Sequence, residues 1–168
     1  SARDAGGAVS RNAQDFVTEV WPHALEASRK TGIPAQFMVA QAALETGWGR
    51  RQLRLEDGSP SHNLFNIKAG SAWTGNTVAR EVTEYAGGQA YTEPSRFRAY
   101  GSYAEAFRDY ANLMTRSPRY ADVLGQTDAA AFARSLQDAG YATDPMYADK
   151  LTRIIGGNTL RNALSTTG

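Results

Sequence analysis

The sequence lacks cysteine altogether and has only two histidines, His23 and His62. Without cysteine, the chain cannot form disulfides, supply a thiol nucleophile or hold zinc through thiolates. No His-Glu-x-x-His motif occurs either, which argues against a zinc peptidase. An excess of charge is also missing, since 18 Lys and Arg face 17 Asp and Glu, for a formal net charge of +1. This balance argues against a dedicated nucleic-acid-binding protein, which usually has a strongly basic face.

Long apolar runs and nucleotide-binding loops are absent as well. The longest uninterrupted apolar run covers residues 129–133, far short of the ~20 residues needed to cross a bilayer. The sequence contains no Gly-x-Ser-x-Gly motif, no glycine-rich phosphate loop and no Asp-rich calcium loop. We therefore expect no metal, no cofactor, no nucleic-acid partner and no membrane insertion. No basic-then-apolar leader precedes the domain, so the signal of an exported protein is expected outside this chain.

The distribution of apolar residues predicts one mainly helical domain. Hydrophobic residues make up 42% of the chain, enough for a packed core in a domain of this length. We predict a linker or flexible start over residues 1–10, the domain over residues 11–160 and a flexible tail over residues 161–168. Apolar residues at helical spacing, with capping residues and glycines at the ends, predict helices over residues 16–32, 34–47, 102–114, 127–140 and 144–155.

A β-leaning segment interrupts this helical pattern between the second and third predicted helices. Residues 77–85 are rich in Thr and Val, Gly87-Gly88 can turn the chain, and residues 89–100 alternate partly between polar and apolar. This pattern predicts a small antiparallel hairpin. A helical lobe beside a small β-lobe offers a cleft between them, where ligands commonly bind.

Glu45 is the one ionisable residue between Lys30 and Arg50, in a segment that is otherwise almost entirely apolar. A helix that is apolar on nearly every face belongs in the interior, and burial of a carboxyl raises its pKa. The residue also falls in the last turn of the predicted helix, where the helix dipole further disfavours the anion. A carboxyl that stays protonated near neutral pH suits a general acid, and Gln41, one turn earlier, can hydrogen-bond to it. The alternative is a structural Glu that pairs with Arg50 or Arg51.

Around Glu45 the sequence resembles a known family. Residues 33–34 (Ile-Pro) and 40–49 (Ala-Gln-Ala-Ala-Leu-Glu-Thr-Gly-Trp-Gly) closely resemble peptidoglycan hydrolases of glycoside hydrolase family 73, and the resemblance covers nearly all of residues 15–155. It implies a mainly α, lysozyme-like α+β fold, in which a helical lobe and a small antiparallel β-lobe flank a glycan cleft. It also implies an endo-β-N-acetylglucosaminidase that cleaves the β-1,4 bond between N-acetylglucosamine and N-acetylmuramic acid. Further matching segments are residues 63–68, 82–85, 97–100, 112–120 and 139–145.

The resemblance also implies roles for particular residues. Glu45 takes the position of the general acid, Glu84 that of the second carboxylate, and Tyr141 that of an active-site tyrosine. Aromatic rings can stack on sugars, and asparagine amides can bind N-acetyl groups or cap turns. The resulting candidates for glycan binding are Trp48, Asn63, Phe65, Asn66, Tyr120 and Tyr147. Trp48, Phe65, Asn66 and Tyr120 fall on segments that, by the resemblance, line the glycan cleft.

Three chemistries are open for Glu84. It can activate water on the opposite face of the sugar, which inverts the anomeric centre, or act as a nucleophile if the two carboxyl groups lie within ~5.5 Å. Alternatively, the substrate's own N-acetyl group attacks, assisted by Tyr141 or another polar group. We favour a wide separation, which argues against a direct nucleophile. Because strand residues alternate in face, only one of Glu81 and Glu84 should point at the cleft, and the other reading of Glu84 is a solvated strand residue.

Within the family, the sequence is most similar to a hydrolase domain that serves flagellar rod assembly. This similarity implies a periplasmic enzyme that opens the wall locally, with peptidoglycan glycan strands as substrate and flagellar rod proteins contacted through a missing N-terminal region. Two other functions stay open. One is a lytic transglycosylase, a class that shares the Glu-Thr-Gly-Trp-Gly motif of residues 45–49, and the other is an inactive peptidoglycan-binding module.

Overall fold

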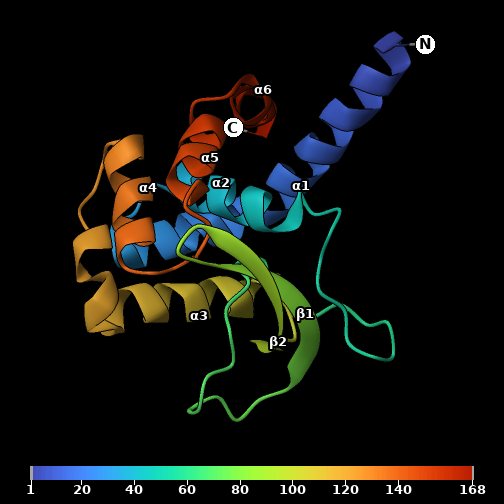
Figure 1. The fold of residues 1–168 in the computed structure, drawn as a ribbon. Helices are drawn as coiled ribbons and strands as arrows, with labels where there is room; N and C mark the ends of the chain where they lie inside the picture. Colours follow the sequence, from blue (N-terminus) through green and yellow to red (C-terminus); the bar gives the residue numbers. More distant parts are fainter. Residues whose placement is uncertain (1, 168) are drawn as a thin grey trace.

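The structure is a computed structural model that describes residues 2–167. Helices form the larger of two lobes, and a β-hairpin with the loops before it forms the smaller one (Figure 1). This arrangement confirms the predicted mainly α architecture with a small antiparallel β-lobe. The elements, in chain order, are α1 (Ala2–Thr31), α2 (Ala35–Thr46), β1 (Thr77–Ala86), β2 (Gln89–Arg98), α3 (Tyr103–Arg116), the 3-10 helix η1 (Pro118–Val123), α4 (Ala129–Asp138), α5 (Tyr147–Ile155) and α6 (Asn158–Thr167).

Helix α2 lies at the centre of the helical lobe. Nine of its residues are buried, and α1 and α5 pack against it. This confirms the interior position predicted from its apolar composition. The ends follow the predicted signals, since Pro34 precedes the helix and Gly47 ends it with φ 57°, in the left-handed region where glycine is free of Cβ strain. Within the described range, no helix is both long and apolar enough to cross a membrane.

Capping residues place the later helices. The Ser102 hydroxyl accepts a hydrogen bond from the backbone N–H of Glu105 at 3.2 Å at the start of α3, and the Glu105 carboxylate accepts from the backbone N–H of Gly101 at 2.6 Å. Asp128 caps α4 in the same way. Helix α5 begins at Tyr147, later than the predicted start at Asp144. The delay has a local cause, because Asp144 precedes a proline, which disfavours helical backbone at that residue.

Both ends of the chain differ from the prediction. The sequence predicts a linker over residues 1–10, but α1 already begins at Ala2. It also predicts a flexible tail over residues 161–168, but most of that segment belongs to α6, which packs against α1. Leu160 and Ala163 are buried there. So short a helix draws its stability from packing on a neighbour, which the composition of the tail does not reveal. The first and last residues lie outside the described range.

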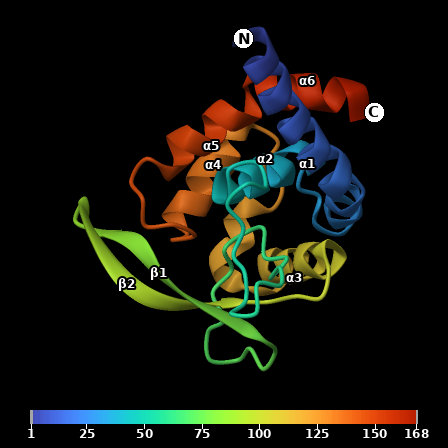
Figure 2. The ribbon, with the colours of Figure 1, turned by 90° about the vertical axis from the view of Figure 1, so that its right-hand side faces the viewer.

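Strands β1 and β2 pair antiparallel along their whole length and form the predicted hairpin. Gly87 and Gly88 make its turn with φ of 58° and 80°, the positive values that two-residue hairpin turns require. Near the open end, the cross-strand pair of Val78 and Phe97 is buried. Figure 2 shows the hairpin as a curved arm beside the helices, with its turn pointing away from α3. The hairpin is therefore held in the core at one end.

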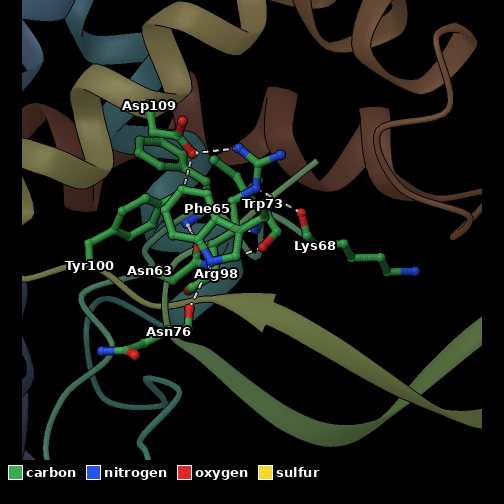
Figure 3. A network of polar contacts seen from close by, with 9 residues as sticks. Asn63, Phe65, Lys68, Trp73, Asn76, Arg98, Tyr100 and Asp109 are labelled. Atoms are coloured by element: carbon green, nitrogen blue, oxygen red, sulfur yellow. Dashed lines mark hydrogen bonds and ion pairs between the residues drawn. The ribbon is translucent and has the colours of Figure 1, made fainter. Parts of the chain in front are cut away.

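A network of polar contacts attaches the base of this hairpin to the helical lobe (Figure 3). Arg98, at the end of β2, donates to the carbonyl oxygen of Lys68 at 3.0 Å and forms an ion pair with Asp109 of α3 at 2.9 Å. Asp109 also accepts a hydrogen bond from the Tyr100 hydroxyl at 2.5 Å. The Arg98 guanidinium lies 5.0 Å from the centre of the Trp73 ring, in a cation–π arrangement. The network therefore determines the direction in which the hairpin leaves the helical lobe.

Asn63 organises the loop between α2 and the hairpin. Its amide nitrogen donates to the carbonyl oxygens of Ile67 at 3.0 Å and Arg98 at 2.9 Å. Its side-chain oxygen accepts from the backbone N–H groups of Phe65 at 3.2 Å and Ile67 at 3.1 Å. The residue is 1% exposed and does not line the cleft described below. The predicted role in glycan binding is therefore wrong for Asn63, because its whole amide is engaged by backbone groups.

Replacing Asn63 with alanine would leave buried backbone groups without partners. Each such group costs about 1–3 kcal/mol, so we expect Asn63→Ala to lower the free energy of unfolding by at least about 3 kcal/mol, measured by urea denaturation. Asn112→Ala is the matched control, because the Asn112 side chain accepts a surface hydrogen bond from Lys30 and its loss should cost less than about 0.5 kcal/mol. Equal losses in the two variants would contradict the role of Asn63.

Candidate active site

A cleft of about 550 Å³ lies between the two lobes, as predicted. Glu45 at the end of α2 and Asn66 line it from the helical side, and Glu84 of β1 lines it from the hairpin side. Residues 140–144, which connect α4 to α5, line it as well. Further lining residues come from β2, α3 and η1, so the cleft brings together segments that lie far apart in the chain.

Glu45 is partly exposed to this cleft and otherwise surrounded by the core. Asn66 donates from Nδ2 to Glu45 Oε2 at 2.8 Å. Burial raises the pKa of Glu45 to about 7, and the side chains of Asn66 and Tyr147 partly offset this rise. Arg50, a predicted alternative partner, donates instead to the carbonyl oxygen of Gly47 at 3.1 Å. Among the side chains that the structure describes, none forms an ion pair with Glu45.

The backbone of Asn66 explains how its amide reaches Glu45. Its φ is 50°, in the left-handed region that asparagine adopts more readily than most residues. The flanking Phe65 and Ile67 are both buried, so the chain turns sharply to present one polar side chain to the cleft between two that pack inward. Backbone strain of this kind is typical of functional sites.

The surroundings of Glu84 favour the charged carboxylate, whereas those of Glu45 favour the neutral acid. Lys68 Nζ contacts its Oε1 at 2.8 Å, and the Thr143 hydroxyl donates to its Oε2 at 2.5 Å. Partial burial acts to raise the pKa of Glu84, but the hydrogen bonds from Lys68 and Thr143 and the charge of Lys68 outweigh it, so the pKa is lowered. Glu81 is exposed and does not line the cleft. The structure therefore places Glu84, and not Glu81, on the cleft.

Tyr141 and Tyr120 also line the cleft, beside each other, with ring centres 6.0 Å apart. The Tyr141 hydroxyl donates to the carbonyl oxygen of Phe65 at 2.5 Å. Burial is the main cause that raises the pKa of Tyr141 well above its usual range, so the hydroxyl stays neutral. Since its proton is engaged, Tyr141 can offer a ligand its ring and an oxygen lone pair.

Three further predicted glycan-binding residues do not line the cleft. Phe65 is fully buried, and its ring stacks on Tyr110 with centres 4.2 Å apart. Tyr147 is 3% exposed and lies in the core beside Glu45. Trp48 is partly buried and packs against the core, with φ 60°. For Phe65 and Tyr147 the prediction of direct glycan contact is wrong, because both rings are buried and the aromatic type does not say whether a ring faces inward or outward. Trp48 keeps part of its surface exposed, so its contact with glycan stays a prediction.

Other cleft residues escaped the sequence analysis. Lys68, Arg98 and Arg119 line the cleft. Lys68 pairs there with Glu84, and Arg98 pairs with Asp109. Arg119 donates to the carbonyl oxygens of Ala139 at 2.9 Å and Gly140 at 2.9 Å, which holds the end of α4. Lys68 lies within a segment that matches the family, which was the one signal that could have singled it out. Arg98 and Arg119 likewise lie within matching segments, over residues 97–100 and 112–120.

These features define the class of protein. A helical lobe and a small β-lobe flank a cleft, and a carboxyl with a raised pKa faces it from the end of a buried helix, so the domain has the lysozyme-like α+β fold. The chain belongs to the glucosaminidase family, whose model, described as mannosyl-glycoprotein endo-beta-N-acetylglucosaminidase, matches residues 21–160. This confirms the family resemblance found in the sequence.

Individual relatives agree with this assignment. Peptidoglycan hydrolase FlgJ of Escherichia coli K12 is 47% identical over 156 residues, which cover 88% of this chain and 50% of the relative. A crystal structure of a mutant peptidoglycan hydrolase from Sphingomonas sp. A1 matches with TM-score 0.88 and 59% identity, covering 91% of this chain and 99% of that one. The glycoside hydrolase domain of Salmonella typhimurium FlgJ matches with TM-score 0.69 and 43% identity, covering 92% and 91%. The chain spans about half the length of the curated relatives it matches.

The raised pKa of Glu45 makes stability depend on pH. Between the ordinary value of 4.5 and about 7, the folded protein binds more protons than the unfolded chain, so this residue lowers stability as the pH rises. We expect Glu45→Gln, which cannot ionise, to match the parent at pH 4 and to exceed its free energy of unfolding by about 3 kcal/mol at pH 8, measured by urea denaturation. Glu81→Gln is the exposed control, and a pH-independent difference at Glu45 would contradict the raised pKa.

Proposed function

We propose that the domain is a peptidoglycan hydrolase, an endo-β-N-acetylglucosaminidase that cleaves the β-1,4 bond between N-acetylglucosamine and N-acetylmuramic acid. The observation that carries this proposal is the pair of carboxyl groups on one cleft, of which Glu45 is held protonated near neutral pH and Glu84 is held ionised. Most glycoside hydrolases use one carboxyl of each kind. Membership of the glucosaminidase family and similarity to named peptidoglycan hydrolases support the substrate.

Glu45 is the general acid in this mechanism. Because Asn66 donates to Oε2, the proton belongs on Oε1, the oxygen left free to meet the glycosidic oxygen of the substrate. Proton transfer to that oxygen lets the bond to the anomeric carbon break as positive charge develops on the sugar. The Asn66 amide then donates to a carboxylate, which is a stronger interaction than with the acid, so it favours the transfer.

Glu84 acts on the other side of the bond. Its charge, maintained by Lys68 and Thr143, stabilises the oxocarbenium-like centre, and we propose that it activates a water molecule, which inverts the anomeric configuration. Tyr141 is the third proposed catalytic residue. Its hydroxyl donates its proton to a carbonyl oxygen, so a lone pair of the hydroxyl oxygen is left to accept a hydrogen bond beside Glu45. Trp48, Tyr120 and Asn66 remain the proposed glycan-binding residues from the sequence analysis.

The proposed setting is the periplasm, where the domain opens the wall locally for the flagellar rod. The similarity to peptidoglycan hydrolases FlgJ supports this setting. Flagellar rod proteins are the proposed partners, contacted through a part of the protein outside this chain.

Two measurements test this function: the activity of a variant without the acid, and the chemical identity of the products that the parent enzyme releases. General-acid catalysis contributes about 10²- to 10⁴-fold, so Glu45→Gln should lower the rate of cell-wall clearing by at least about 100-fold, with Glu81→Gln unchanged. Mass spectrometry of the parent's digest should find fragments ending in reducing N-acetylglucosamine. Fragments ending in anhydro-muramic acid would show a lytic transglycosylase, and a parent that binds the wall without clearing it would be a binding module.

The two carboxyl groups should produce a bell-shaped pH profile of kcat/KM. Activity should fall above pH about 7 as Glu45 ionises, and it should fall in acid as Glu84, whose pKa is lowered, becomes protonated. Glu84→Gln should abolish the acid limb together with most of the rate, and azide should restore cleavage with an inverted glycosyl azide as product. An unchanged acid limb in Glu84→Gln, or a retained anomeric configuration in the parent, would contradict its role as base.

A further inference from the structure

Three polar side chains from three helices meet in the core next to Glu45. Tyr110 of α3 donates from its hydroxyl to Gln41 Oε1 of α2 at 2.6 Å. Tyr147 of α5 packs nearby, and its ring stacks on that of Tyr141 with centres 6.0 Å apart. Gln41 and Tyr147 are 0% and 3% exposed. We call Tyr110, Gln41 and Tyr147 the buried polar triad.

Two atoms of the triad are buried without a hydrogen-bond partner. They are Gln41 Nε2 and the Tyr147 hydroxyl, which make no hydrogen bond of accepted geometry within residues 2–167. Buried polar groups are nearly always paired, because an unpaired one loses its hydration without compensation. Leucine at position 41 and phenylalanine at position 147 would fill the same space without this cost. The two polar groups therefore call for a role beyond packing.

Their position relative to the acid suggests that role. Gln41 and Glu45 are four residues apart on α2, so they share one face of the helix. Burial, and next the negative charge of Glu45, raise the pKa of the Tyr147 hydroxyl, while Gln41 acts in the opposite direction. The Tyr147 hydroxyl therefore lies near both side chains, but it makes no hydrogen bond with either. Contacts of this kind in free enzymes commonly tighten only when substrate is bound.

The direction of the hydrogen bonds is determined by their chemistry. Because Tyr110 donates to Gln41 Oε1, the other end of that amide presents only N–H donors. An N–H of Gln41 can satisfy the oxygen of Tyr147, and the tyrosine proton then has Glu45 as its acceptor. All three groups would donate toward Glu45, and donors in series polarise one another in the same sense.

We propose that Tyr147 is a positioning residue for the general acid, whose hydroxyl, oriented by Gln41, donates to the Glu45 carboxylate formed when the proton leaves for the glycosidic oxygen. This inference rests on the proposed function for its catalytic meaning. The acid proton itself travels from Glu45 to the leaving oxygen, and the tyrosine keeps its own proton throughout. Tyr147 thereby stabilises the anion from the core side, as Asn66 does from the cleft side.

The other titratable groups near Glu45 do not change their protonation state around pH 7, where the Glu45 carboxyl is expected to titrate. The surrounding tyrosines have raised pKa values, chiefly through burial, and stay neutral there. The acidic group on the facing hairpin is already ionised at that pH and paired with a lysine. In chain order, these groups are Lys68, Glu84 on β1, Tyr110 on α3, Tyr120 on η1, Tyr141 in the connection between α4 and α5, and Tyr147 on α5.

The deciding experiment is an NMR titration of the Glu45 carboxyl carbon in Tyr147→Phe, without substrate. Removal of a donor destabilises the carboxylate, so the midpoint should move upward from about 7, by up to about one unit, or tenfold in the ionisation constant. The alkaline limb of the kcat profile should move with it, and kcat at pH 5 should fall about tenfold. An unmoved or lowered midpoint would overturn the proposal, since a residue that only packs would not shift the titration upward.

Matched variants separate folding from positioning. Tyr103→Phe removes another tyrosine hydroxyl, which donates to Gln52 at 2.9 Å away from the cleft, and should leave the midpoint unchanged. Gln41→Met removes the group that orients Tyr147 and should move the midpoint in the same direction by a smaller amount, which keeps the proposal testable if Tyr147→Phe does not fold. Because the titration needs no substrate, it can succeed or fail whether or not the domain cleaves peptidoglycan.

Discussion

The burial of one carboxyl at the end of an apolar helix is the constraint to which the rest of the site responds. Helix α2 has to be apolar because it passes through the core, and Glu45 in its last turn is therefore partly removed from water. Burial alone favours the neutral acid. Asn66, held in a left-handed backbone, and Tyr147 of the buried polar triad oppose this preference. The balance leaves a proton that is retained near neutrality but can still be given up.

The second carboxyl is brought to the opposite state by residues from other parts of the chain. Glu84 stays ionised because Lys68 and Thr143 surround it with donors. The loop between α4 and α5 contributes to both environments, since Tyr141 lies beside Glu45 and Thr143 contacts Glu84. Two carboxyl groups with pKa values pushed apart are the usual basis for separate acid and base roles in one cleft. Here, a single loop links the two environments.

The hairpin carries Glu84 between two attachments of different strength. At its base, the ion pair of Arg98 and Asp109 is largely shielded from solvent and reinforced by Tyr100 and Trp73. Farther out, the contact with Lys68 is with a half-exposed lysine, and exposed ion pairs contribute little to stability. A substrate can therefore replace the outer contacts of Glu84 without disturbing the base that orients the hairpin.

The sequence by itself determined the apolar second helix, its lone acidic residue, the hairpin with its Gly-Gly turn and the capped later helices, because each depends on neighbours within a few positions. It did not reveal that Phe65 and Tyr147 face inward, that the Asn63 amide forms its hydrogen bonds with backbone groups, or that the tail forms a helix that packs against α1. These outcomes depend on partners distant in the chain. Only the tertiary structure decided which side chains face the cleft, and with them the ionised state of Glu84, because solvent access and donor geometry arise when separate segments pack together.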